Sequence, residues 1–197
     1  MAITVTDIPL ETLTRLVNGW GTLPRQEDGR GGDPHLPASG IAAELALPPR
    51  VSAALTADVL ADAADTLHAV FSAPDAEAGA RVLTRLLSGT GVRPVVDVDA
   101  TGTLRAAWSV DDERDAPLAA AAITLRQYVA AHGFARIGIC TGGRCADVYV
   151  DQSPGGRRRF CSVTCQNRAR VAAFRSRRAA ASGGARPVPE AQPGVGE

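Results

Sequence analysis

The 197-residue sequence contains no lysine, and all 21 of its basic residues are arginine. Aromatic residues make up only 4% of the chain, so a core has to be built mostly from Leu, Val and Ala. No apolar run reaches the roughly 18 residues that a membrane-spanning helix needs. Residues 1–10 lack the basic and apolar regions of a secretory signal peptide. We therefore expect a bacterial, cytoplasmic protein that does not enter a membrane.

Signatures of enzymes are also missing. The three histidines, His35, His68 and His132, are far apart in the sequence, and none has ligand spacing with another. The sequence has no dinucleotide-binding glycine pattern, no Walker loop and no G-x-S-x-G motif. We therefore expect a protein without enzymatic activity.

Cysteine is scarce but concentrated, because all four cysteines lie within 26 residues. They form two close pairs, Cys140/Cys145 and Cys161/Cys165, with the spacing C-x4-C-x15-C-x3-C. Four thiolates at this spacing suit one structural Zn²⁺ ion, which takes four ligands tetrahedrally. Two disulfides or four buried free thiols are the alternatives. Clustered cysteines in an intracellular chain favour the metal.

The residues around the cysteines predict the local fold. Gly142 and Gly143 permit a tight turn between the first pair. Residues 147–150 are predicted to form a strand that returns, after a turn at residues 154–156, as a second strand over residues 157–160. A helix then begins near Cys161 and carries the last two ligands. This order of knuckle, hairpin and helix predicts a treble-clef-like zinc finger.

The helix after the last cysteine is rich in arginine. Residues 140–197 hold 10 basic and 4 acidic residues, a net of +6, whereas residues 1–139 hold 11 basic and 17 acidic residues, a net of −6. Such a split favours a polyanionic partner for the basic part. Val163, Val171 and Phe174 share one side of the helix and are expected to pack on the hairpin. The candidate nucleic-acid contacts are Arg157, Arg158, Arg159, Asn167, Arg168, Arg170, Arg175, Arg177 and Arg178.

Hydrophobic periodicity in the front part predicts helices with one hairpin between them. The expected helices cover residues 8–20, 38–47, 51–70, 75–87 and 117–132, and Gly133 is the expected cap of the last helix. The expected hairpin lies near residues 93–110, with strands at residues 93–98 and 103–110. The predicted fold class is therefore α+β. The predicted domains are a helical domain over residues 1–133, a finger over residues 134–180 and a disordered tail over residues 181–197.

Residues 136–178 resemble the zinc finger named for a Cys-Gly-Asn-Arg tetrapeptide, the CGNR finger. The tetrapeptide appears as Cys165-Gln166-Asn167-Arg168, with glutamine in place of the glycine, and the third cysteine follows the run GRRRF. The front part is similar to the ABATE domain, through Leu16-Val17-Asn18 with Trp20, a hairpin that ends in Trp108 and the Leu-rich helix just before the finger. The resemblance implies binding to double-stranded DNA and stress-induced regulation of transcription by a nucleoid-associated protein.

Three functions compete at this point. The first is a DNA-binding regulator whose front domain senses a small-molecule effector or forms a homodimer. The second is a zinc module that binds RNA or protein without sequence-specific recognition of DNA. The third is an enzyme with a structural zinc ion, which the lack of a convergent acid–base or nucleophile set disfavours.

Overall fold

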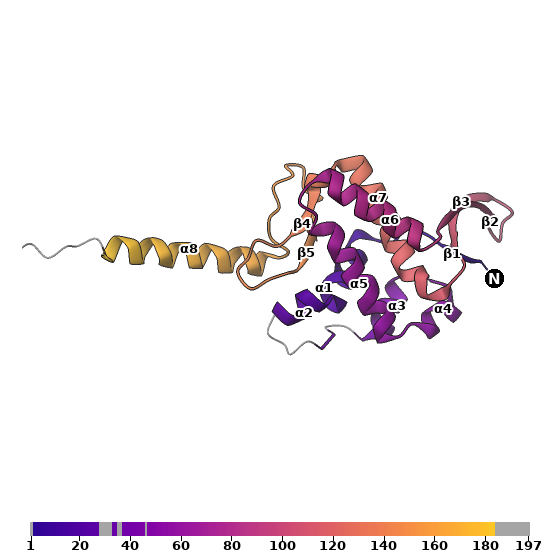
Figure 1. The fold of residues 1–197 in the computed structure, drawn as a ribbon, viewed down its shortest axis with the longest axis horizontal. Helices are drawn as coiled ribbons and strands as arrows, with labels where there is room; N and C mark the ends of the chain where they lie inside the picture. Colours follow the sequence, from indigo (N-terminus) through magenta and orange to yellow (C-terminus); the bar gives the residue numbers. More distant parts are fainter. Residues whose placement is uncertain (1, 28–32, 35–36, 46, 184–197) are drawn as a thin grey trace, which may run out of the picture.

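A helical body with a long helix projecting from one end makes up the molecule (Figure 1). The computed structural model describes residues 2–27, 33–34, 37–45 and 47–183. In chain order the elements are β1 (Ile3–Val5), α1 (Leu10–Trp20), α2 (Thr22–Glu27), α3 (Ala38–Glu44), α4 (Pro49–Ala54), α5 (Ala57–Phe71), α6 (Ala76–Gly89), β2 (Arg93–Val98), β3 (Leu104–Val110), the 3₁₀ turn η1 (Glu113–Asp115), α7 (Ala116–His132), the 3₁₀ turn η2 (Phe134–Arg136), β4 (Ile137–Ile139), β5 (Val148–Val150) and α8 (Val163–Gly183). The mixture of helices and small sheets confirms the predicted combination of helix and strand.

Helix α7 lies at the centre of the body. Its residues from Ala119 to Leu125 are all buried, so the helix is enclosed on every side instead of along one stripe. The one polar side chain in this stretch is Thr124, whose hydroxyl accepts a hydrogen bond from the Ile8 N–H at 2.8 Å and donates to Ala120 O at 2.9 Å. Gly133 caps the helix with φ of 87°, as predicted.

Helices α1, α5 and α6 pack around α7. Leu13, Leu16 and Val17 of α1 are fully buried, as the helical spacing predicts. The expected single helix over residues 51–70 is wrong, because the chain is extended at Leu55 and two helices form instead. Thr56 explains the break, since its hydroxyl accepts the Val59 N–H at 3.3 Å and starts α5 as an N-cap.

A three-stranded sheet in the order β1-β3-β2 lies at the end of the body away from α8 (Figure 1). The hairpin of β2 and β3 forms where it was predicted, with Val98 opposite Leu104 and Arg93 opposite Ser109. Strand β1 is an addition that the sequence analysis did not predict, and it pairs with β3. The tip of the hairpin is solvated, and Val96 and Leu104 are 71% and 70% exposed.

The small sheet of β4 and β5, which flanks the first cysteine pair, joins the cysteine group to the body. Ile137, Val148 and Val150 are buried and belong to the same hydrophobic cluster as the residues of α1 and α7. The boundary predicted between residues 133 and 134 therefore falls within a continuous core, and separate folding of the two parts stays a prediction. Helix α8 runs to Gly183, three residues into the predicted tail, and residues 184–197 lie outside the described residues.

None of the helices that the structure describes is both long enough and apolar enough to span a bilayer.

Candidate metal centre

The four cysteine Sγ atoms converge on one point. All four lie within 4.8 Å of one another, and Cys145, Cys161 and Cys165 form a nearly equilateral triangle with Sγ–Sγ distances of 3.6–3.7 Å. Four sulfurs around one zinc ion at a Zn–S distance of about 2.3 Å are about 3.8 Å apart. A disulfide would bring two sulfurs to about 2.05 Å, and all four cysteines are free. The group fits a single tetrahedral metal ion.

The first pair is held by a tight knuckle that follows β4. The Cys140 N–H donates to Asp147 O at 2.8 Å, and the Gly142 N–H donates to the Cys140 sulfur at 3.4 Å. A Cβ atom on Gly142 would lie 3.3 Å from the Cys140 sulfur and 3.4 Å from Cys165 Cβ, so a side chain here would be in tight contact with the cysteine group. The left-handed residue of the turn is Arg144, with φ of 57°, and not a glycine.

The second pair is positioned by the start of α8. Cys161 lies two residues before the helix, and Cys165 is its third residue. The Ser162 hydroxyl accepts the Cys165 N–H at 3.2 Å, and the Ser162 carbonyl accepts the Gln166 N–H at 3.1 Å. Ser162 therefore acts as a helix cap, which fixes the direction in which α8 leaves the cysteine group.

The thiols influence one another's ionisation. Burial raises the pKa of Cys145 to about 12 and raises the pKa of Cys161, and the negative charge of Asp147 adds to both shifts. Burial also opposes ionisation of Cys140. Hydrogen bonds to its sulfur from the Cys161 and Gly142 N–H groups and from the Cys145 and Cys161 thiols together outweigh burial and lower the pKa of Cys140. Four thiolates in one place need a cation, and a bound Zn²⁺ would supply the compensating charge.

A loop between the pairs is built around Asp151. The carboxylate of Asp151 accepts the Ser153 N–H at 2.9 Å and the Arg158 N–H at 2.8 Å. The Arg158 guanidinium donates to three carbonyls, at 2.9 Å to Phe160, at 3.2 Å to Val150 and at short distance to Cys161. The predicted second strand over residues 157–160 is wrong, because β5 pairs with β4 and these residues are irregular.

Most of the predicted nucleic-acid contacts are exposed on α8. Asn167, Arg168, Arg170, Arg175, Arg177 and Arg178 are all exposed, and residues 163–183 include no acidic residue. Among the described residues, no carboxylate forms an ion pair with Arg168, Arg170, Arg175 or Arg177. Arg157 and Arg159 are exposed in the segment before Cys161, and the Arg159 carbonyl accepts the Thr141 N–H at 2.9 Å.

The apolar side of α8 does not pack on the finger, so that prediction is wrong. Val163, Val171 and Phe174 are 70%, 49% and 54% exposed. The reason is the direction of α8, which leaves the body after its first turns and projects outward (Figure 1). The guanidinium of Arg178 lies 6.0 Å from the centre of the Phe174 ring. The helix therefore presents apolar and cationic side chains together.

Three side chains of the body hold the cysteine region in place. Asn18 bonds the backbone of Val148, and the His68 Nε2 atom lies 2.9 Å from Ala146 O, next to Cys145. The Tyr128 hydroxyl donates to Asp151 O at 2.7 Å. None of these roles could be assigned from the sequence, because the partners are backbone atoms far away in the chain. The only sequence feature that could have indicated these contacts is the polar character of Asn18 and His68 within their helices.

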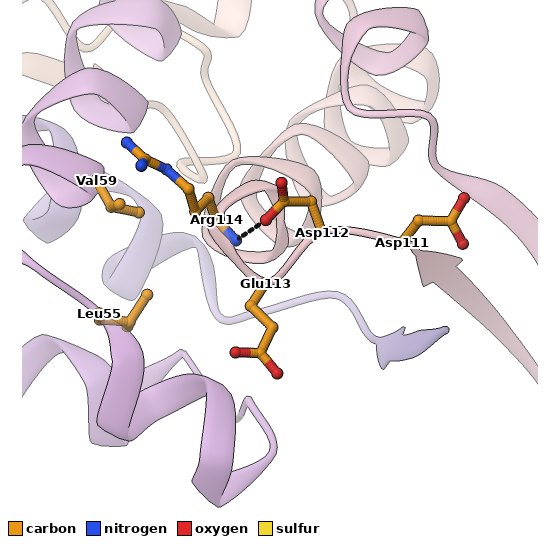
Figure 2. Close-up of a pocket in the computed structure, with 6 residues that line it drawn as sticks. All are labelled: Leu55, Val59, Asp111, Asp112, Glu113 and Arg114. Atoms are coloured by element: carbon orange, nitrogen blue, oxygen red, sulfur yellow. Dashed lines mark hydrogen bonds between the residues drawn. The ribbon is translucent and has the colours of Figure 1, made fainter. Parts of the chain in front are cut away.

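An acidic loop before α7 is a second polar cluster, beside Leu55 and Val59 (Figure 2). Figure 2 shows the carboxylates of Asp111, Asp112 and Glu113 pointing in different directions. Asp111 pairs with Arg93 at 2.7 Å, Asp112 accepts the Arg114 N–H at 2.9 Å, and Glu113 lies 3.5 Å from Arg50. Among the described residues, the cysteines alone form a group of three or more potential metal ligands.

Comparison with known proteins agrees with this geometry. Residues 136–178 match the family model of the CGNR zinc finger. The match covers all four cysteines and most of α8 and begins after the helical front part. A comparison with curated protein sequences finds no match. The C-terminal part is therefore a zinc finger module with a four-cysteine site.

Proposed function

We propose that this protein is a zinc-dependent, DNA-binding regulator of transcription that uses α8 to contact duplex DNA. The observation that carries the proposal is α8 itself. It starts at the cysteine group, projects from the body and carries five arginines with no acidic residue. An α-helix fits the major groove of B-DNA, and arginine pairs with phosphate and with guanine.

The arginines are arranged for contact with two strands. With 3.6 residues per turn, Arg168 and Arg175 follow one side of α8, and Arg170 and Arg177 follow another side. Asn167 lies between these two sides in the second turn, where a recognition helix meets base edges. The arrangement supports phosphate contacts on both flanks of the helix, with Asn167 and Arg168 reading bases. A treble-clef-like finger would brace the helix through one structural zinc ion.

The body supplies the second part of the proposed regulator. Residues 1–133 would form an ABATE-like domain that senses an effector or forms a homodimer, in keeping with a stress-responsive regulator. The support is the contact between the body and the cysteine region through Asn18, His68 and Tyr128. A change in the body would reach the start of α8 through these contacts.

The deciding experiment measures the affinity of the zinc-loaded chain for random and selected duplexes at a series of salt concentrations, with fluorescence anisotropy as the readout. The affinity should fall with a log–log slope of about −0.9 for each phosphate neutralised. Arg175→Ala and Arg177→Ala should weaken binding to all duplexes and flatten the slope by about one unit. Asn167→Ala should cost about 1–3 kcal/mol on the selected duplex alone.

Arg105→Ala is the matched control, because Arg105 is an exposed arginine on the hairpin at the other end of the molecule. This variant should bind like the native chain. Absence of binding to any duplex at low salt would overturn the proposal.

A second candidate, a protein partner, is favoured by one observation. Val171 and Phe174 are about half exposed in the middle of α8, between the arginines. An apolar groove with an acidic rim on another protein would cover these residues and neutralise the arginines. In that case Phe174→Ser would abolish capture of the partner, and duplexes would not compete. If α8 binds DNA, Phe174→Ser would leave the salt slope unchanged.

A further inference from the structure

An apolar groove lies on the body between α6, α7 and η2, and none of the four cysteines lines it. Its volume is about 320 Å³, which is within the range of small-molecule sites. The described residues that line it include Gly79, Ala80, Leu83, Arg126, Val129 and Phe134. Arg126 is the single charged residue among them.

The two ends of the groove differ. Gly79 of α6 meets the Phe134 ring, because a Cβ atom there would lie 2.2 Å from Phe134 Cε2. This end is therefore next to η2, which leads directly into β4 and Cys140. Arg126 lies about two turns earlier along α7, beside the hairpin, with its guanidinium 6.0 Å from the centre of the Trp108 ring.

The Arg126 guanidinium carries a positive charge at one end of the groove. Among the described residues, no carboxylate forms an ion pair with Arg126. Glu77, the single acidic residue of α6, forms an ion pair with Arg81 one turn away. An arginine at one end of an apolar groove complements a molecule that has one anionic group and an apolar remainder.

We propose that this groove binds a small organic acid with an apolar chain or ring. Its anionic group would lie at Arg126, and its apolar part would cover Leu83 and Val129 and reach Phe134. This binding site is independent of duplex binding by α8, so either proposal can fail without the other. A ligand that fills the groove would contact Phe134 at the start of the segment that leads to the cysteine group.

The test uses two probes of equal shape, 2-naphthylacetate and its uncharged amide 2-naphthylacetamide, titrated into the whole zinc-loaded chain by isothermal calorimetry. The acid should bind with one site per chain. The amide should bind about fivefold more weakly, which is the upper range for an exposed ion pair. Arg126→Gln should remove this preference by weakening the acid alone, and Arg126→Lys should keep part of it.

Two further variants locate the site. Ala80→Leu adds three carbons inside the groove and should weaken both probes to a similar degree. Arg85→Gln is the matched control, because Arg85 is exposed on the same helix but does not line the groove, and it should change neither affinity. The proposal is overturned if neither probe gives a saturable signal, if Arg126→Gln keeps the preference for the acid, or if Ala80→Leu binds both probes like the native chain.

Discussion

The side-chain amide of Asn18 bonds both backbone groups of Val148, which is 130 residues away in the chain. The Asn18 Nδ2 atom donates to Val148 O at 3.0 Å, and the Val148 N–H donates to Asn18 Oδ1 at 2.7 Å. The amide thus closes the free side of β5 in the way that a neighbouring strand would. It ties α1 to the strand that lies between the two cysteine pairs.

Replacement of Asn18 should therefore destabilise the whole chain. Asn18→Ala leaves the N–H and carbonyl of the buried Val148 without partners, which costs about 1–3 kcal/mol for such groups. Urea denaturation followed by circular dichroism would measure the loss. Asn167→Ala is the control, because Asn167 is exposed on α8, and its effect should be close to zero. Equal stability of the two variants would show that the two hydrogen bonds between Asn18 and Val148 contribute nothing to stability.

Much of the fold could be predicted from the sequence because local patterns determine it. The spacing of Leu13, Leu16 and Val17 predicted α1, and the turn at residues 99–102 predicted the hairpin. The cysteine spacing likewise predicted that four sulfurs would meet.

The errors arose where a tertiary contact decides the structure. A strand over residues 157–160 is absent because Arg158 and Asp151 satisfy that backbone with side chains. The orientation of the helix at the metal centre likewise depends on tertiary contacts that the sequence pattern does not show. The direction of α8, which leaves Phe174 exposed, is fixed by the Ser162 cap and the cysteine group, and no periodicity within the helix indicates it.

The front part alone should fold, but less stably than the whole chain. Residues 1–133 retain the core around α7 and lose the cover that Ile137, Val148 and Val150 provide. We expect a cooperative transition in differential scanning calorimetry at a lower temperature than that of the whole chain. A non-cooperative fragment would show that the two parts share one inseparable core.

The two glycines of the knuckle should differ in their effect on metal affinity. Gly142→Ala would crowd Cys140 and Cys165, whereas a Cβ atom on Gly143 has open space. We expect Gly142→Ala to lose roughly tenfold in zinc affinity, as for other changes next to ligands, and Gly143→Ala to lose little. Competition with a chromophoric chelator would measure both, and native mass spectrometry should give one zinc per chain. Full zinc affinity in Cys161→Ser would contradict the assignment of the site.

The carboxylate of Asp151 should make stability depend on pH. Burial opposes its ionisation, but hydrogen bonds from Ser153 and Arg158 outweigh burial and lower the pKa of Asp151. A lowered pKa in the folded state gives stability that is present above the unfolded value of about 3.9 and is lost as the pH falls through the folded value. The difference in unfolding free energy between the native chain and Asp151→Asn, from urea titrations, should be constant near neutral pH and shrink below about pH 4. A difference that does not depend on pH would mean that the charge of Asp151 is irrelevant.

The three adjacent arginines before Cys161 should divide between two roles. Arg158 donates to the carbonyls of Val150, Phe160 and Cys161, so it braces the chain at a metal ligand. Arg157 is exposed and is available for a phosphate. Arg158→Ala should therefore lower zinc affinity and thermal stability, and Arg157→Ala should change neither.

Duplex binding separates the two roles further. Arg157→Ala should flatten the salt slope by about one unit. Arg158→Ala should leave the slope of the zinc-loaded fraction unchanged. Arg158→Lys provides the sharpest comparison, because it keeps the charge but cannot reproduce the planar fork that reaches three carbonyls. It should therefore be as defective in zinc retention as Arg158→Ala. Full zinc retention by the lysine variant would show that Arg158 acts only through its charge.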